Sequence, residues 1–427
     1  FDKTLKEENN MTYFFYSMAS IVFFFFTLIF IRKTLVAINI KRIDSLTILA
    51  LLLGSGLAYY AFERFSMTPV YEAFAVSLMM YLATIEKRKN YFFVGFFSFF
   101  FLMIRWVNYY FVLLPIFVFY LMNKKQNIKK YLITNPYYFF GLFSGLGLFL
   151  VHTKTLYNFI GINPSKVSNY AGPAINLIDK FLNLSNLENF VSVETLVTIL
   201  KDFTLILFSQ EFGLIWFSPV LFMLFYIILK TLFTKKYEIF FLLLTIVSIP
   251  LGIVILWKSV ASSYGYRYMF SLIPIAIVLS YKYLSTKEFK VLTTLNIFSI
   301  FLYLMFETNE LNSLREQINV FGVDTKYSAR YYIQGTLNSA LDLNSYLTIF
   351  GTSFIAVILI KFVLIFIDLE TLQEFISNFG YLNDDVNRLI NYSNNMSLVE
   401  ILVYLILIVY FVQKLINQRF LFNNKQN

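Results

Sequence analysis

Apolar runs long enough to cross a membrane recur along the whole chain, and they constrain its fold more than any other feature. The hydrocarbon core of a bilayer is about 30 Å thick, so a crossing helix needs roughly 20 mainly apolar residues. Hydrophobic residues make up 58% of the chain and charged residues only 14%. Because backbone polar groups in lipid must be paired within the protein, such runs predict helices. We therefore expect an all-α, polytopic helical membrane protein.

About twelve transmembrane segments are expected, with ends good to a few residues. Their ranges are 12–31, 45–62, 69–85, 91–104, 107–122, 133–151, 213–231, 238–257, 267–284, 290–306, 345–367 and 398–417. Residues 1–306 then form one transmembrane module with a long outer loop at 152–212. Residues 307–427 hold another outer loop and the C-terminal helices.

Basic residues predict the orientation of these segments. Through residue 306 they cluster after each odd-numbered segment, which is the positive-inside pattern of cytoplasmic loops. The clusters are Arg32, Lys33, Lys41 and Arg42; Lys87, Arg88 and Lys89; Lys124, Lys125, Lys129 and Lys130; Lys230, Lys235 and Lys236; and Lys282, Lys287 and Lys290. The net charge of +10 therefore indicates membrane topology and no nucleic-acid partner. The acidic stretch 368–397 fits this alternation less well.

Several chemistries are excluded by what the sequence lacks. The chain has no cysteine, which excludes disulfides, thiolate metal sites and cysteine nucleophiles. His152 is its one histidine, which excludes a histidine-cluster metal site. No phosphate-binding glycine loop, dinucleotide fingerprint or serine-hydrolase elbow is present.

Two predicted boundaries combine cations with aromatic residues. Lys258 and Tyr266 lie in the loop after the segment that ends at 257, and Arg267 and Tyr268 open the segment 267–284. Arg105 lies beside Trp106 at a tight connection between 91–104 and 107–122. Cations at such places face a cavity, where they suit a phosphate, or they anchor the chain at the interface. Both interpretations remain open for these residues.

Four stretches, taken in order, resemble the membrane-embedded glycosyltransferases of the GT-C class, in particular bacterial relatives of protein O-mannosyltransferases and aminoarabinose transferases. The first is a helix pair around a short loop, and the second is a helix that ends in arginine before a proline-containing helix. The third contains the sequence Leu-Phe-Ser, then a glycine, and then a Ser-Pro pair at the start of a helix. The fourth contains a tryptophan, several small residues and an Arg-Tyr pair. They are 51–82, 96–121, 207–226 and 257–279.

The resemblance implies an integral protein of a bacterial or archaeal cytoplasmic membrane, with its active face outside. It would move a sugar from a polyprenyl-phosphate carrier to an acceptor lipid, glycan or protein. A carboxylate would act as general base or orient the acceptor, and cations or a divalent metal would hold the leaving phosphate. The family's best-known aspartate lies in the first outer loop. We expect that loop to precede Phe1, and residues 1–427 alone to lack transfer activity.

The resemblance also suggests roles for particular residues. Glu72, near the start of 69–85, corresponds to a second acidic position and is the candidate catalytic residue of this chain. In the alternative interpretation, Glu72 has no part in catalysis and forms a structural ion pair with Arg64. Donor phosphate would be bound by Arg267, Arg105 and Lys258, while Glu211 and Tyr266 would orient the outer loops.

Other classes of membrane protein remain as alternatives. A flippase for lipid-linked glycans or a secondary transporter would show internal pseudo-symmetry, and no repeat is evident. A glycan polymerase or ligase would rely on outer-loop arginines, which 152–212 lacks. A non-catalytic membrane scaffold is a further alternative.

Overall fold

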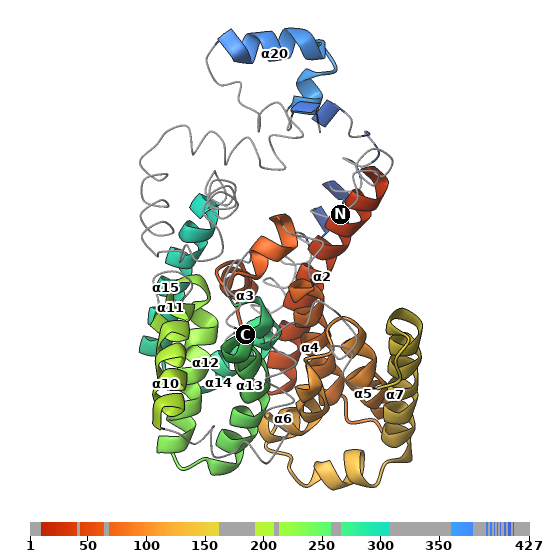
Figure 1. Ribbon diagram of the computed structural model, residues 1–427, viewed down its shortest axis with the longest axis vertical. Helices are drawn as coiled ribbons and strands as arrows, with labels where there is room; N and C mark the ends of the chain where they lie inside the picture. Colours follow the sequence, from red (N-terminus) through yellow and green to blue (C-terminus); the bar gives the residue numbers. More distant parts are fainter. Residues whose placement is uncertain are drawn as a thin grey trace, which may run out of the picture. The chain divides into compact units, whose positions relative to one another are not determined.

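Every secondary-structure element that the structure describes is a helix (Figure 1). The computed structural model describes residues 10–40, 43–63, 68–161, 193–208, 213–257, 266–306 and 360–378, and scattered residues between 390 and 413. The chain divides into two compact units, Phe1–Ile300 and Phe301–Asn427. The all-α prediction is thus confirmed for the described part of the chain.

The described helices differ widely in length and include short 3₁₀ and π turns. In chain order they are α2 (Asn10–Ala37), α3 (Ser45–Leu53), the π-helix η1 (Tyr59–Glu63), α4 (Pro69–Thr84), α5 (Asn90–Phe100), η2 (Phe101–Met103), η3 (Tyr109–Leu113), α6 (Leu114–Leu121), the π-helix η4 (Lys129–Ile133), α7 (Pro136–Tyr157), α10 (Val193–Phe208), α11 (Leu214–Phe217), α12 (Pro219–Phe233), α13 (Tyr237–Trp257), η8 (Arg267–Leu272), α14 (Ile273–Tyr283), α15 (Thr286–Phe306) and α20 (Leu369–Asn378).

Several predicted segments are interrupted rather than continuous. The predicted segment 45–62 is split, because α3 ends at Leu53 and a turn follows before η1. Gly56 in that turn has φ of 79°, a left-handed conformation that glycine adopts without steric cost. The predicted segments 107–122 and 267–284 begin instead with the 3₁₀ turns η3 and η8.

Three of the described helices are long and apolar enough to cross a membrane. They are Met18–Ala37, Pro136–Tyr157 and Tyr237–Ile255. Three shorter apolar helices accompany them, at Asn90–Met103, Tyr109–Leu121 and Pro219–Phe233. The larger number of about twelve segments stays a prediction. The predicted segment 345–367 lies mostly outside the described residues, and 398–417 is described only at scattered positions.

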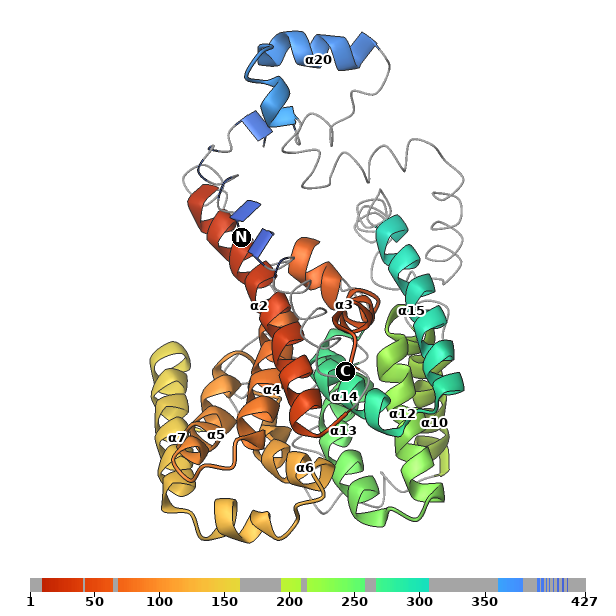
Figure 2. The ribbon, with the colours of Figure 1, turned by 180° about the vertical axis from the view of Figure 1, so that it is seen from behind.

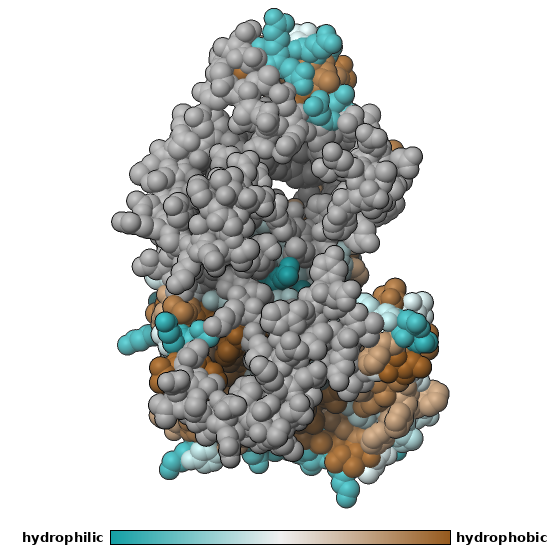
Figure 3. Space-filling model, in the orientation of Figure 1, coloured by the Kyte–Doolittle hydropathy of each residue, from teal (hydrophilic) through white to brown (hydrophobic). Residues whose placement is uncertain are grey.

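Large apolar side chains cover much of the outside of the first unit. On α7 the exposed set is Tyr137, Phe139, Phe140, Phe143, Leu148, Val151, Leu156 and Tyr157. Figure 3 shows this side of the molecule as hydrophobic surface. Soluble monomers rarely expose apolar patches of this extent, whereas lipid covers them at no cost. The exposed surface therefore agrees with the membrane-crossing length of α7.

Helices α5 and α7 lie side by side (Figures 1 and 2) and approach closely through glycine. A Cβ atom on Gly141 would overlap the backbone carbonyl of Phe92, and one on Gly145 would overlap that of Phe96. Gly95 on α5 faces the backbone of α7 in the same way, at Tyr138. Small residues let membrane helices pack backbone against backbone, so these three glycines set the spacing of this pair.

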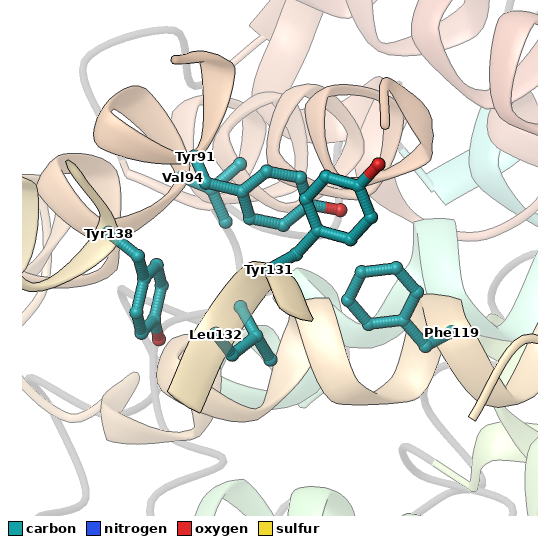
Figure 4. Packing of buried hydrophobic residues seen from close by; sticks show 6 residues of the cluster. All are labelled: Tyr91, Val94, Phe119, Tyr131, Leu132 and Tyr138. Atoms are coloured by element: carbon teal, nitrogen blue, oxygen red, sulfur yellow. The ribbon is translucent and has the colours of Figure 1, made fainter. Parts of the chain in front are cut away.

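A stacked aromatic cluster joins two of the predicted cytoplasmic connections (Figure 4). The rings of Tyr91 and Phe119 lie 5.9 Å apart at 7°, and Tyr131 stacks on Tyr91 at 5.0 Å. The Tyr131 hydroxyl donates to the Glu86 carbonyl at 2.8 Å, and the Glu86 carboxylate pairs with Lys124. The connection after α4 is thereby fixed to the connection after α6.

Two more basic connections meet at this same end. Lys125 pairs with Glu238 at the start of α13. Lys282, at the end of α14, donates to the carbonyl of Leu121. Because the basic clusters of four different connections contact one another or their neighbours, they share one end of the bundle. This is the arrangement that the positive-inside pattern predicts, and which compartment that end faces stays a prediction.

We expect the two ends of α7 to be reached from opposite sides of the membrane. The chain has no cysteine, so single cysteines can be introduced at Gln126, before η4, and at Ile160, just beyond α7. Both positions are exposed. An impermeant maleimide should label Ile160→Cys in intact cells and Gln126→Cys only after permeabilisation. Labelling of both from one side would show that α7 does not cross.

Glu288, at the start of α15, is held by three neighbouring groups. Its carboxylate accepts from Lys230 Nζ at 2.6 Å, from the Tyr226 hydroxyl and from the Ser285 backbone N–H at 2.6 Å. These contacts, with Lys230 as the largest cause, lower the pKa of Glu288 to about 2. The lowered pKa means that the folded protein favours the ionised carboxylate.

The stability that Glu288 contributes should therefore depend on pH. A carboxylate whose folded pKa lies below its unfolded value, about 4.3, stabilises the fold above that value. The contribution is lost as pH falls from about 4.3 towards 2. We expect Glu288→Gln to lower the melting temperature at pH 7 and to match the parent protein near pH 2. A difference that stays constant between pH 7 and pH 2 would contradict this expectation.

Candidate functional site

The first turn of α4 carries a buried carboxylate. Pro69 is the first residue of this helix, and Glu72 lies in its first turn, where the helix dipole favours an anion. The side chain of Glu72 is fully buried. Its Oε1 lies 3.1 Å from Arg105 Nε, and its Oε2 accepts a hydrogen bond of 2.7 Å from Asn108 Nδ2. One carboxylate oxygen is therefore hydrogen-bonded, and the other lies at ion-pair distance from Arg105 without a hydrogen bond in the described part of the chain.

Both partners of Glu72 come from one break between helices. Arg105 and Asn108 lie between η2 and η3, at the tight connection that the sequence predicts. Asn108 is fully buried, and the side chain of Arg105 is only 13% exposed. Asn108 Oδ1 accepts from the Ser271 hydroxyl at 3.2 Å, and Ser271 belongs to η8. Three segments that are distant in sequence, namely α4, the connection between η2 and η3, and η8, thus meet through one network of polar side chains.

A tyrosine ring lies against two guanidinium groups. Arg105 Cζ is 4.7 Å from the centre of the Tyr268 ring, and Arg267 Cζ is 5.4 Å from it. Tyr268 is buried, and Arg267 beside it is half-buried. Guanidinium groups stack favourably on aromatic faces, and this contact fixes the plane of the group. Among the described residues, the site then holds two guanidinium groups and one carboxylate.

Some buried polar atoms around Glu72 make no hydrogen bond in the described part of the chain. They are Glu72 Oε1 itself, Arg105 Nη1 and the hydroxyl of Thr68. Thr68 lies one turn before Glu72, whose N–H donates to the Thr68 carbonyl. Buried polar groups without partners are costly, so such atoms mark where a ligand oxygen or an ordered water would bind.

The structure brings together three of the residues that the sequence singles out. Glu72, Arg105 and Arg267 lie around Tyr268 and its neighbours. Tyr266 is buried, and its backbone carbonyl accepts from Met269 at the start of η8. Lys258 and Glu211 lie outside the described residues. Arg64, the partner that the structural interpretation gives Glu72, also lies outside them, and the partner that the structure describes is Arg105.

Tyr268, the tyrosine of the Arg-Tyr pair, belongs to this arrangement, as do Asn108 and Ser271, which sequence reasoning does not single out. One signal exists for Asn108, which is the single amide side chain in the stretch 96–121. A polar residue in such surroundings is expected to face the protein interior. Frequent asparagines elsewhere in the chain weaken that signal.

Metal binding and similarity to known proteins add no further assignment. The described residues contain no group of three or more histidine, cysteine, aspartate or glutamate side chains that could hold a metal ion. No family model, curated protein or solved structure matches the chain.

Proposed function

We propose that this chain is a membrane glycosyltransferase that takes a sugar from a polyprenyl-phosphate carrier. The observation that carries the proposal is the pair of arginines, Arg105 and Arg267, whose guanidinium groups both lie against the ring of buried Tyr268. Guanidinium groups bind phosphate oxygens in pairs, with both charge and fork geometry complementary. The GT-C resemblance assigns donor binding to these two arginines on grounds independent of their contacts.

The charges of the site suit a single phosphodiester. Among the described residues, the site places two guanidinium groups beside one carboxylate, a composition that favours an anionic ligand. A sugar joined to a polyprenol through one phosphate carries one negative charge. The phosphate would lie at the Tyr268 end of the bundle, the polyprenyl chain would follow the apolar helix surfaces, and the acceptor would approach from the aqueous side.

The proposal predicts that Arg267→Ala weakens the binding of undecaprenyl phosphate to the purified protein. Loss of one charge-assisted contact costs about 1.5–3 kcal/mol, which raises Kd roughly 10- to 100-fold. Arg267→Lys should recover only part of the affinity, because lysine lacks the planar fork. Isothermal titration in detergent measures both values.

Arg88→Ala is the matched control, because Arg88 is an exposed arginine in the connection after α4, among the basic connections. Its Kd should equal that of the parent protein. An unchanged Kd in Arg267→Ala would return Arg267 to the role of an interfacial anchor. Sugar transfer from an undecaprenyl-phosphate sugar, measured with the full-length protein beside residues 1–427 alone, tests the reaction itself.

A further inference from the structure

We infer that Asn108 is a positioning residue: it fixes Glu72 as the counter-ion of Arg105 and thereby aims the Arg105 guanidinium at the donor phosphate. This inference rests on the proposed function. It also gives Glu72 a role that differs from that of a general base, since a base needs an oxygen that can reach the substrate proton. Glu72 has no exposed side-chain surface, its Oε2 is hydrogen-bonded to Asn108, and its Oε1 faces the Arg105 guanidinium at 3.1 Å.

The contact with Glu72 uses one particular edge of the Arg105 guanidinium. Glu72 approaches Nε, which lies at the root of the fork. The terminal nitrogens are left for other partners, and Nη1 is buried without a hydrogen bond in the described part of the chain. Arg105 Cζ lies over the Tyr268 ring, 4.7 Å from its centre. Arg105 is thus held at Nε and against this ring, while its terminal nitrogens keep the geometry that suits a phosphate.

Asn108 is itself fixed at both ends of its amide. The amide nitrogen donates to Glu72 Oε2, and the amide oxygen accepts from the Ser271 hydroxyl. The reverse orientation would bring the amide oxygen against a carboxylate, so the network determines which way the amide points. Ser271 shares η8 with Arg267 and Tyr268. Asn108 therefore connects η8, which carries Arg267, to Glu72, which is the counter-ion of Arg105.

Exchanging the carboxylate and the amide between positions 72 and 108 tests whether Asn108 positions Arg105 or only stabilises the fold. The double variant Glu72→Gln with Asn108→Asp keeps one amide, one carboxylate and a hydrogen bond between the two positions. It moves the negative charge from beside Arg105 Nε to the neighbouring position. We expect its melting temperature to recover relative to each single variant. We also expect its Kd for undecaprenyl phosphate to stay at least about 10-fold above that of the parent protein, because a charge-assisted contact on Arg105 is lost.

The neutral alcohol undecaprenol is the matched probe, since it lacks only the phosphate. Its binding should be equal in the parent protein and in the double variant. A double variant with a restored melting temperature and the parent Kd for undecaprenyl phosphate would overturn the inference, because the pair would then serve the fold alone.

Ser271→Ala keeps every charge and serves if the exchanged pair does not fold. It removes the donor to Asn108 Oδ1, together with the Ser271 contact to the Tyr110 hydroxyl. We expect a several-fold higher Kd for undecaprenyl phosphate and an unchanged Kd for undecaprenol, and equal values for the phosphate would again overturn the inference. A parent protein that binds the phosphate no better than the alcohol would overturn the proposed function and this inference with it. That result is recognised before any variant is made.

Discussion

Replacing Glu72 by alanine should destabilise the protein by about 3–5 kcal/mol, the usual cost of removing one partner from a buried ion pair. The substitution leaves Arg105 Nε without its carboxylate and the Asn108 amide without its acceptor, and both groups are largely or fully buried. Unfolding in mixed detergent micelles measures the change in free energy.

Glu238→Ala is the matched control for this substitution. Glu238 also forms an ion pair, with Lys125, but the two side chains are 61% and 53% exposed. Exposed pairs contribute less than about 1 kcal/mol, so this variant should remain close to the parent protein. Equal losses in Glu72→Ala and Glu238→Ala would show that burial of the Glu72 pair carries no particular energetic weight.

Gly141→Ala should have the next largest effect. We expect it to lower the free energy of unfolding by about 1–3 kcal/mol, because the larger side chain forces two packed helices apart. The added methyl group would overlap the Phe92 carbonyl, and a backbone atom cannot move aside as a flexible side chain can. Helices α5 and α7 would have to separate along their contact. Thermal unfolding and crosslinking between the two helices report the two consequences.

Gly147, on the same helix, gives the opposite expectation. No atom lies within 4 Å of a Cβ placed there. Alanine costs less backbone entropy than glycine in a helix, so Gly147→Ala should stabilise α7 by about 0.5–1 kcal/mol. If both variants lost the same stability, helix propensity rather than the glycine contact would govern this pair.

Sequence patterns predict the helical class and the gathering of basic connections, because both follow from local composition. The start of α4 at Pro69 is likewise readable, since proline favours the first turn of a helix. The break after α3 also has a local signal, in the Gly54–Ser55–Gly56 turn, although 45–62 reads as one apolar run. Apolar length alone therefore overestimates continuous helix where glycine permits a turn.

The partners of Glu72 could not be predicted from local pattern. A neighbouring arginine, Arg64, is the natural candidate when only sequence distance is known. The partner that the structure describes, Arg105, comes from another helix pair, and Asn108 lies 36 residues from Glu72. Which polar residues meet across helices depends on packing, and single-sequence periodicity carries no information about it.

The separation between Glu72 and its partners also bears on how the protein is made. A ribosome synthesises α4 before the connection that contains Arg105 and Asn108. Asn108, the more distant of these two residues, follows Glu72 by 36 residues. Until that connection emerges, the carboxylate has neither cation nor amide, and an isolated carboxylate enters lipid at high cost. In the predicted topology, we therefore expect α4 to enter the bilayer stably only together with the following helix pair, so that α4, α5 and α6 are delivered to the membrane as one group.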